Sequence, residues 1–336
     1  MNGTKRVIWI DIVKIISAFL IVLQHSLAME WVEAMNPANA NWRVINFLFI
    51  ISRMGVPLFF MCSGMTMFRR KHGIREIFLS SIPKILIPYF FWMLIYGVSE
   101  AINSSTPRIA VNSIIKAVIF GHYHTWFIAT LIGLYIITPL VQEFIYDSVL
   151  LRYAIVLSLI FTVITPYVSL VGDNRVENVI NDFNMHFVVG YILYFLLGYF
   201  LGNTQLVGRN ALLYGAPILF FLVICQFLCV TKVGEKGQDI QNYFSAFSVI
   251  CVIISSLIFL FVRTVAEKID APKLVTAVMM LESFGIGIYL VHPLFLPLIN
   301  GMHGYIRIIG AMIVYICALL TNAIIYITPL KKLLLK

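Results

Sequence analysis

The sequence predicts an all-α polytopic membrane protein with about ten transmembrane helices and both termini in the cytoplasm. Three observations predict this class. Of the 336 residues, 61% are hydrophobic and only 12% are charged, whereas a soluble domain has about one quarter charged residues. Apolar stretches of about 20 residues, long enough to cross a bilayer as a helix, recur along the whole chain. Positive charges collect at alternate ends of these stretches.

Short polar segments separate the predicted spans, which lie near 7–29, 46–68, 78–101, 124–144, 150–171, 183–203, 209–230, 241–263, 274–297 and 304–328. The gaps at 30–45 and 102–123 are loop-sized, so we expect one integral-membrane domain over residues 1–336. The first span resembles a signal peptide in following Lys5 and Arg6. It is too long for one and has no small-residue cleavage site before Glu30, so we expect it to remain as a helix.

The distribution of Lys and Arg predicts the orientation, because short cationic loops stay in the cytoplasm. With the N-terminus inside, the cytoplasmic side contains Lys5, Arg6, Arg69, Arg70, Lys71, Arg75, Arg152, Arg209, Arg263, Lys268, Lys273, Lys331, Lys332 and Lys336. The opposite side contains Arg43, Arg108, Lys116, Arg175, Lys232, Lys236 and Arg307. The net charge of +9 therefore reflects topology, and nucleic acid, which needs a soluble basic face, is not an expected partner.

Several small features refine the helices. The segment 108–120 is too short to span and is expected to lie on the surface or re-enter the membrane. Prolines inside spans predict kinks that frame an internal cavity: Pro57, Pro88, Pro139, Pro293 and Pro297. Two glycine pairs, Gly198 with Gly202 and Gly285 with Gly287, predict close helix packing. The five cysteines all lie in apolar segments without metal-ligand spacing and are expected to be buried structural thiols.

The first span carries ionisable residues, which are costly in a membrane and usually face a cavity or a partner. Lys14 and His25 are eleven residues apart, which in a helix corresponds to about 16 Å along the axis and about 20° around it. They therefore share one face, with Ala18 between them, and could border an elongated ligand. The alternatives are that Lys14 extends to the headgroups and that His25 bonds a backbone carbonyl at the outer interface.

Other spans add polar residues that could converge on the same space. The second span carries Arg53, the fourth opens with GHYHTWF, and the ninth contains ESFGIGIYLVHPLF with Glu282 and Ser283. We expect four residues to share the outer half of the membrane: His25, Arg53, His124 and His292. We expect His122 and His124 on different sides of a helix, so a metal site is not expected there.

These residues resemble a known family. Asp11, Lys14 and His25, with FFMCSG, HTWFIATLIGLYIITP and GIYLVHPLF, are similar to the bacterial integral-membrane acyltransferases of the acyltransferase-3 type. That family has Asp, then Arg, ten residues and His in its first span, and FFxxSG in its second. Lys14 stands where the family has arginine, which keeps the cation but loses the bidentate fork. Without the esterase-like domain of some members, the chain resembles the stand-alone O-acetyltransferases.

The resemblance implies a transfer from cytoplasmic acyl-CoA, acetyl-CoA above all, to a hydroxyl of an envelope glycan or a lipid-linked sugar. It implies no tightly bound cofactor and a place in the bacterial cytoplasmic (inner) membrane. Neutral imidazole suits proton abstraction at pH 7, so His25 is the expected general base, with an acyl-histidine route as the alternative. Asp11 and Arg53 are expected to be catalytic with His25.

Two further groups of residues receive expected roles. Lys14 is expected to bind acyl-CoA with Arg69, Arg70 and Lys71, although these last three could serve only as topology anchors. Candidates for substrate binding or for the oxyanion donor are Ser63, His124, Trp126, Tyr289 and His292.

Two other classes of function remain open from the sequence. A transporter or flippase without acyl chemistry would also need a polytopic bundle with buried charges and kinked helices. A membrane sensor or assembly protein could use the same polar residues only for packing. The sequence does not specify the acceptor, the acyl length or O- against N-acylation, and it leaves a homodimer open because lipid-facing and subunit-facing surfaces look alike.

Overall fold

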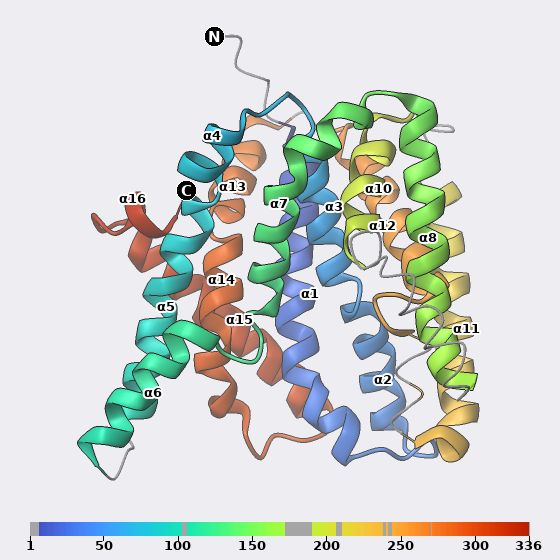
Figure 1. Ribbon diagram of the computed structural model, residues 1–336. Coiled ribbons are helices and arrows are strands. Elements are labelled where there is room, and N and C mark those ends of the chain that lie inside the picture. Colours follow the sequence, from blue (N-terminus) through green and yellow to red (C-terminus); the bar gives the residue numbers. More distant parts are fainter. Residues whose placement is uncertain are drawn as a thin grey trace.

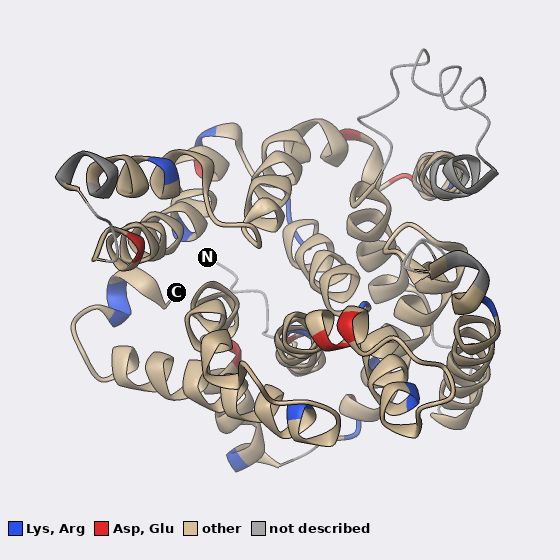
Figure 2. Cartoon of the chain, turned by 90° about the horizontal axis from the view of Figure 1, so that it is seen from below, with Lys and Arg blue, Asp and Glu red and all other residues tan. Residues whose placement is uncertain are grey.

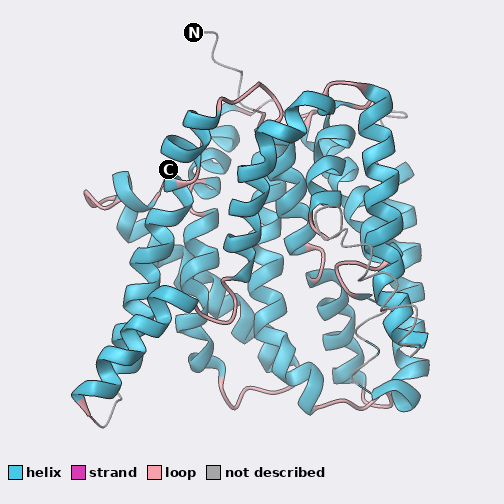
Figure 3. Ribbon diagram, viewed as in Figure 1, coloured by secondary structure: helices cyan, strands magenta, loops and turns pink. Residues whose placement is uncertain are grey.

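The computed structural model is a bundle of α-helices and has no strand among the residues that it describes (Figures 1 and 3). It describes residues 7–102, 106–171, 190–205, 210–237, 240, 244–269 and 271–335. Eight helical segments in this part are long and apolar enough to cross a membrane: Ile8–Glu33, Ala40–Met67, Ile74–Ile102, Trp126–Ile145, Leu212–Gly234, Val249–Ala266, Pro272–Ile299 and Tyr305–Tyr326. The chain is therefore a multi-pass membrane protein, as the composition predicts.

Several of these segments consist of more than one helix. The uninterrupted ones are α1 (Ile8–Glu33), α7 (Trp126–Ile145), α11 (Leu212–Lys236), α12 (Val249–Ala266) and α15 (Tyr305–Tyr326). The second segment is divided into α2 (Ala40–Ser52) and α3 (Gly55–Met67), and the third into α4 (Ile74–Glu76), the π-helical η1 (Ile77–Ser81) and α5 (Pro83–Ile102). The seventh is divided into α13 (Pro272–Glu282), α14 (Gly285–Val291) and the 3-10 helix η3 (His292–Ile299).

The shorter helices account for the remaining predicted segments. The window 150–171 coincides with α8 (Ser148–Val171), and 183–203 contains α10 (Ile192–Asn203), although 183–189 lies outside the described residues. The segment 108–120 is α6 (Pro107–Phe120), which packs along α5. A Cβ atom added to Gly97 would lie only 2.7 Å from the Cα atom of Ile114, so the two helices form a tight hairpin. The chain ends near α16 (Lys331–Leu334).

Helix α1 lies in the middle of the bundle, where it contacts α2, α3, α12, α13, α14 and α15 (Figure 1). Its first turn lies at the end that also holds the α3–α4, α7–α8 and α12–α13 connections, and its last turn lies at the other end. Seen along the bundle axis, most of the described chain consists of residues other than Lys, Arg, Asp and Glu (Figure 2). Of the residues used to predict the orientation, Lys5, Arg6, Arg175, Arg209 and Lys336 lie outside the described part, as do the side chains of Arg108 and Lys236.

Prolines explain where two spans break. Pro57 has no N–H to donate to the carbonyl of Arg53, four residues earlier, and its ring would clash with that carbonyl. The chain accordingly leaves α2 at Ser52 and begins α3 at Gly55. Pro293 likewise frees the carbonyl of Tyr289 at the point where α14 gives way to η3. Both breaks are kinks that the sequence predicts.

Glycines allow α3 and α10 to approach each other closely. A Cβ atom on Gly64 would lie 1.8 Å from the carbonyl oxygen of Phe195, and one on Gly198 would lie 1.9 Å from that of Met61. The packing prediction is confirmed for Gly198, and also for Gly202 and Gly287. It is wrong for Gly285, where a Cβ atom would meet no atom within 4 Å because this residue borders a cavity.

Four cysteines are buried and Cys317 is partly exposed.

We expect Gly64→Ala to lower the free energy of unfolding by about 1–3 kcal/mol, because backbone atoms must move apart to admit the methyl group. The matched control is Gly133→Ala on α7, where a Cβ atom would meet no atom within 4 Å. Equilibrium unfolding of the detergent-solubilised protein measures both. Equal stability of the two variants would contradict the interlocked α3–α10 contact.

Candidate active site

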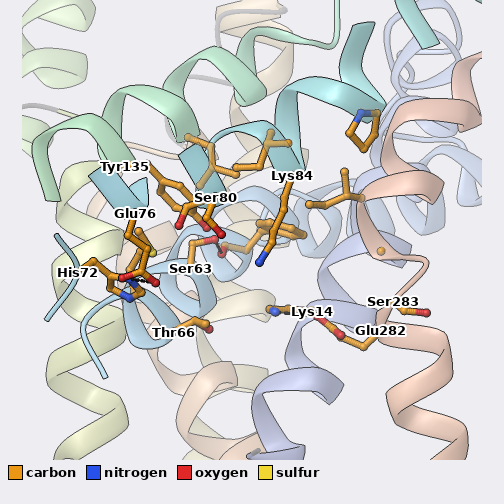
Figure 4. Close-up of a pocket in the computed structure, with 18 of the residues that line it drawn as sticks. Lys14, Ser63, Thr66, His72, Glu76, Ser80, Lys84, Tyr135, Glu282 and Ser283 are labelled. Carbon is orange, nitrogen blue, oxygen red and sulfur yellow. Dashed lines mark hydrogen bonds and ion pairs between the residues drawn. The ribbon is translucent and has the colours of Figure 1, made fainter. Parts of the chain in front are cut away.

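A cavity of about 310 Å³ surrounds Lys14 on the half of the bundle where α1 begins (Figure 4). Side chains from α1, α3, α5, α7 and the α13–α14 junction enclose it. Its polar lining consists of Lys14, Ser63, Thr66, Arg70, His72, Glu76, Ser80, Ser81, Lys84, Tyr135, Glu282 and Ser283. The many hydroxyl groups and several cations make this a site for a ligand that combines amides or hydroxyls with negative charge.

The Lys14 ammonium has a carboxylate partner inside this cavity. Its Nζ lies 2.7 Å from Oε1 of Glu282, the last residue of α13, and the two side chains are only 21% and 18% exposed. Lys14 therefore does not extend to the headgroups, the alternative left open by the sequence. Lys84 points into the cavity from α5 (Figure 4), and no carboxylate among the described residues pairs with it.

The α3–α4 connection forms the rim of the cavity. Arg70 Nη1 donates to Glu76 Oε2 at 3.0 Å, and His72 Nδ1 lies 3.2 Å from Glu76 Oε1. Burial, aided by the charge of Arg70, lowers the pKa of His72 below its ordinary value, although Glu76 opposes this. The Nζ atom of Lys71 instead lies 3.6 Å from Oε1 of Glu143.

Of the three predicted CoA-binding cations in this connection, only one shares the cavity with Lys14. That residue is Arg70. Arg69 lines a separate surface hollow beside α10, and Lys71 lines neither of the two.

The second polar site is a cluster of histidines around His25. The ring centre of His25 lies 5.1 Å from that of His292 and 6.5 Å from that of His124, and the last two are 5.7 Å apart. His124 and His292 are buried, while His25 is partly buried. Three of the four residues expected to share the outer half are thus brought together.

A tight turn before α7 carries His122 and His124. Gly121 adopts a φ of 72°, and a Cβ atom there would lie 2.3 Å from Thr125 Oγ1, so glycine is required. Nδ1 of His122 lies 3.0 Å from Nδ1 of His124. The expectation that these two rings point to different sides of a helix is wrong, because α7 begins only at Trp126.

The hydrogen bonds of His292 fix its tautomer. Its Nδ1 lies 2.7 Å from the carbonyl oxygen of Tyr289, the one freed by Pro293. A carbonyl only accepts, so Nδ1 carries the proton and Nε2 of the neutral ring carries a lone pair. That Nε2 is buried and has no hydrogen-bond partner among the described residues. The geometry suits His292 for accepting a proton or an N–H rather than for donating to an oxyanion.

Two tyrosines hydrogen-bond backbone carbonyls near the histidines. The Tyr289 hydroxyl donates to the carbonyl of His124 in the turn, and the Tyr96 hydroxyl of α5 donates to the carbonyl of Leu290 of α14 at 2.8 Å. Both hydroxyl groups are thus engaged with backbone. The role of Tyr289 in substrate binding stays a prediction.

Two other predicted residues lie away from His25. Ser63 lines the Lys14 cavity, where its hydroxyl donates to the carbonyl of Phe59 at 2.9 Å. Trp126 is 46% exposed, and its ring lies 5.4 Å from that of Tyr191.

Asp11 and Arg53 are not among the rings that surround His25. Asp11 is buried in the first turn of α1, about 21 Å along the helix axis from His25 because a helix rises 1.5 Å per residue. Arg53 lies at the α2–α3 break, where its guanidinium is 4.9 Å from the ring centre of Phe49. The structure thus separates these two residues from the base that they were expected to assist.

An aromatic layer lies between the cavity and the histidines. Phe59 lines the cavity, and its ring packs edge-on against Phe127 with centres 5.1 Å apart. Phe127 is 1% exposed, and its ring also contacts those of Phe60 at 4.8 Å and Tyr289 at 5.0 Å. A chain of ring contacts from Phe59 through Phe127 and Tyr289 to His124 thus connects the cavity with the histidines.

Several residues that line the cavity were not predicted from the sequence as part of a site. Lys84 and Tyr135 lie four residues before Pro88 and Pro139, so each belongs to a turn whose carbonyl lacks its helical donor. A polar side chain one turn before a proline in a span was therefore an available signal. The pairing of Glu282 with Lys14 carried no such signal, because 268 residues separate the two.

Comparison with known proteins agrees with this architecture. The acyltransferase domain family matches residues 7–327, nearly the whole chain, so the protein belongs to the acyltransferase-3 family. It is 22% identical over 286 residues to the probable poly-beta-1,6-N-acetyl-D-glucosamine export proteins of Staphylococcus aureus strains MRSA252 and MSSA476. These alignments cover 82% of this chain and 79% of each relative. No solved structure matches the chain at a significant level.

The Lys14–Glu282 pair should appear as energetic coupling. We expect Lys14→Met and Glu282→Gln each to lower the free energy of unfolding by about 1–3 kcal/mol, because each leaves a largely buried charge without its partner. The double variant should lose less than the sum of the two by about 1 kcal/mol, measured by equilibrium unfolding. Strict additivity would show that the pair contributes no coupling.

Proposed function

We propose that this acyltransferase-3 protein moves an acetyl group from acetyl-CoA, bound on the Lys14 side, to a hydroxyl of an envelope glycan or a lipid-linked sugar near His25. The observation that carries this proposal is the placement of two different polar sites on one central helix. The first is a cation- and hydroxyl-lined cavity at Lys14, and the second is a set of imidazoles about 16 Å further along α1. The cationic loops support a cytoplasmic position for the cavity, on the side where acyl-CoA is found.

The chemistry of the cavity matches the donor. CoA carries phosphates on one end and an amide-rich pantetheine arm on the other. Lys84 and Arg70 lie on the parts of the lining nearest α4 and η1, and they suit the phosphates. Ser63, Thr66 and Tyr135 offer hydroxyl groups to the amides. The pantetheine arm would then pass Lys14 and extend along α1.

The proposed reaction is a single acyl transfer. His25 takes the proton of the acceptor hydroxyl while that oxygen forms a bond to the thioester carbonyl carbon. The tetrahedral intermediate then collapses, the C–S bond breaks, and the proton passes to the CoA thiolate. The products are the acetyl ester and free CoA, so no other reactant is required.

His292 is proposed to position His25. Its lone pair on Nε2 would accept an N–H of His25, which leaves the other nitrogen of His25 free as the base. An N–H···N bond of about 2.9 Å between two imidazoles in line places the ring centres about 5 Å apart. The ring centres are 5.1 Å apart, which is close enough for this bond to form by reorientation of the rings, because Nε2 of His292 has no other hydrogen-bond partner among the described residues. His124 is then the remaining imidazole beside the reacting groups and is the proposed donor to the oxyanion.

The relatives support a glycan acceptor, and their bacterial source supports a place in the cytoplasmic membrane of a bacterium. They are named for poly-beta-1,6-N-acetyl-D-glucosamine, a polysaccharide rich in hydroxyl groups. A β-1,6-linked N-acetylglucosamine oligomer is therefore the acceptor to test first. The word export in the same names favours a second candidate, a polysaccharide transporter without acyl chemistry, which would have no use for an acyl-CoA site.

Binding and turnover of radiolabelled acetyl-CoA by the detergent-purified protein separate these candidates. Lys14→Ala should raise the dissociation constant about tenfold by removing a cation from the donor site, and Lys14→Arg should restore it. His25→Ala should lower hydrolysis and transfer at least about 100-fold with unchanged binding, because it removes the base. A folded, monodisperse wild type that binds no acetyl-CoA would favour the transporter.

The proposed role of His292 has its own test. In His292→Asn the amide N–H replaces Nδ1–H as the donor to the Tyr289 carbonyl, but nothing replaces Nε2. We expect kcat to fall about 10- to 100-fold while KM for acetyl-CoA and the unfolding midpoint stay unchanged. Normal turnover in this variant would show that His292 only ties α14 to η3.

A further inference from the structure

A second hollow, of about 500 Å³, opens beside the histidine cluster between the α5–α6 hairpin and α7. Its wall is largely apolar and aromatic, and it includes Leu86, Ile119, Phe120, Trp126 and Ile132. Ala129, near the middle of the α7 wall, leaves the groove wide at that point. We call this hollow the lateral groove.

The mouth of the lateral groove faces lipid. Phe120 is 80% exposed and Ile119 is 65% exposed, and both belong to an apolar helix that packs along the spanning helix α5. Exposed apolar side chains on a transmembrane bundle contact the bilayer. The groove is thus open to a hydrocarbon chain from the membrane.

The inner end of the lateral groove is polar and leads to His25. His122 lines the groove, and its Nδ1 lies 3.0 Å from that of His124. Tyr123 lines it as well, with its ring centre 5.7 Å from that of His25. The groove therefore joins an apolar mouth to the reacting imidazoles.

The depth of His25 fits the head group of a lipid. Seventeen residues separate it from the first residue of α1, which corresponds to about 26 Å along the axis, in a hydrocarbon core about 30 Å thick. With the first residue of α1 at the inner boundary of the hydrocarbon, His25 would lie in its outer half. A polar group attached to a membrane-embedded chain would reach this level without leaving the bilayer.

We propose that the lateral groove binds the hydrocarbon chain of a lipid-linked sugar, so that the acceptor hydroxyl reaches His25 sideways from the bilayer. This inference rests on the proposed acyl transfer and selects the acceptor class for it. The donor enters along α1 from the opposite end, so the two substrates meet at the histidines without sharing a path.

Filling the groove should discriminate between acceptors. The variant is Ala129→Phe, and the matched control is Gly133→Phe, one turn further along α7, where a Cβ atom meets no atom within 4 Å. In lipid nanodiscs with acetyl-CoA, we compare a β-1,6-linked N-acetylglucosamine oligomer attached to a polyprenyl phosphate with the same oligomer free in solution. Ala129→Phe should lower kcat/KM for the lipid-linked oligomer about tenfold. Its activity toward the free oligomer, and both activities of Gly133→Phe, should stay within about twofold of wild type.

Equal losses for both oligomers in Ala129→Phe, or no loss for either, would overturn the inference. A second readout does not depend on turnover: the lipid-linked oligomer with a diazirine in its prenyl chain should label groove residues of α5, α6 or α7. An excess of unlabelled lipid-linked oligomer should abolish this labelling, and an excess of phospholipid should not. Competition by phospholipid alone would show that the groove holds only annular lipid. Labelling with these properties in a protein that fails to turn over acetyl-CoA would refute the acyl transfer while supporting the groove.

Discussion

The structure depends on the cost of placing ionisable side chains inside a membrane. An ammonium group in a bilayer needs a partner or a polar cavity, and Lys14 has both, in Glu282 and in the hydroxyl-lined space around it. The buried His292 meets the same constraint as a neutral ring whose Nδ1–H donates to the carbonyl of Tyr289. Lys14 and His25, the neighbour of His292, both lie on α1 in the middle of the bundle.

Prolines impose a second constraint of the same kind on the spanning helices. A proline in a span frees a carbonyl that must find another donor in a place without water. At Tyr289 the donor is Nδ1 of His292, so the break that ends α14 also sets the tautomer of a histidine beside His25. At Arg53 the break between α2 and α3 places a guanidinium 4.9 Å from the ring centre of Phe49. Backbone breaks therefore determine which polar side chains meet.

Much of the fold follows from local patterns that the sequence displays. Span length, proline kinks and the Lys14–His25 face of α1 depend on residues within one helix, so periodicity and hydrophobicity predict them. Other features depend on how separate helices pack against one another. They are the α5–α6 hairpin, the Lys14–Glu282 pair and the contact of His25 with His292. Lys84 has only a local signal, its place one turn before Pro88, and the tertiary arrangement turns its side chain into the cavity. The distance of Asp11 from His25 follows from the rise of α1 alone, whereas the place of Arg53 beside Phe49 depends on how α2 and α3 pack.

Helix α1 is proposed to link a donor site at Lys14 to a reaction site at His25, across the layer formed by Phe59 and Phe127. A cryo-electron microscopy structure with a non-hydrolysable thioether analogue of acetyl-CoA would test this link. We expect phosphates beside Lys84 and Arg70, a displaced Phe127 ring, and the analogue's sulfur within about 4 Å of the His25 ring. An analogue bound outside the cavity, or one whose sulfur remains on the Lys14 side of an unmoved Phe127, would contradict it.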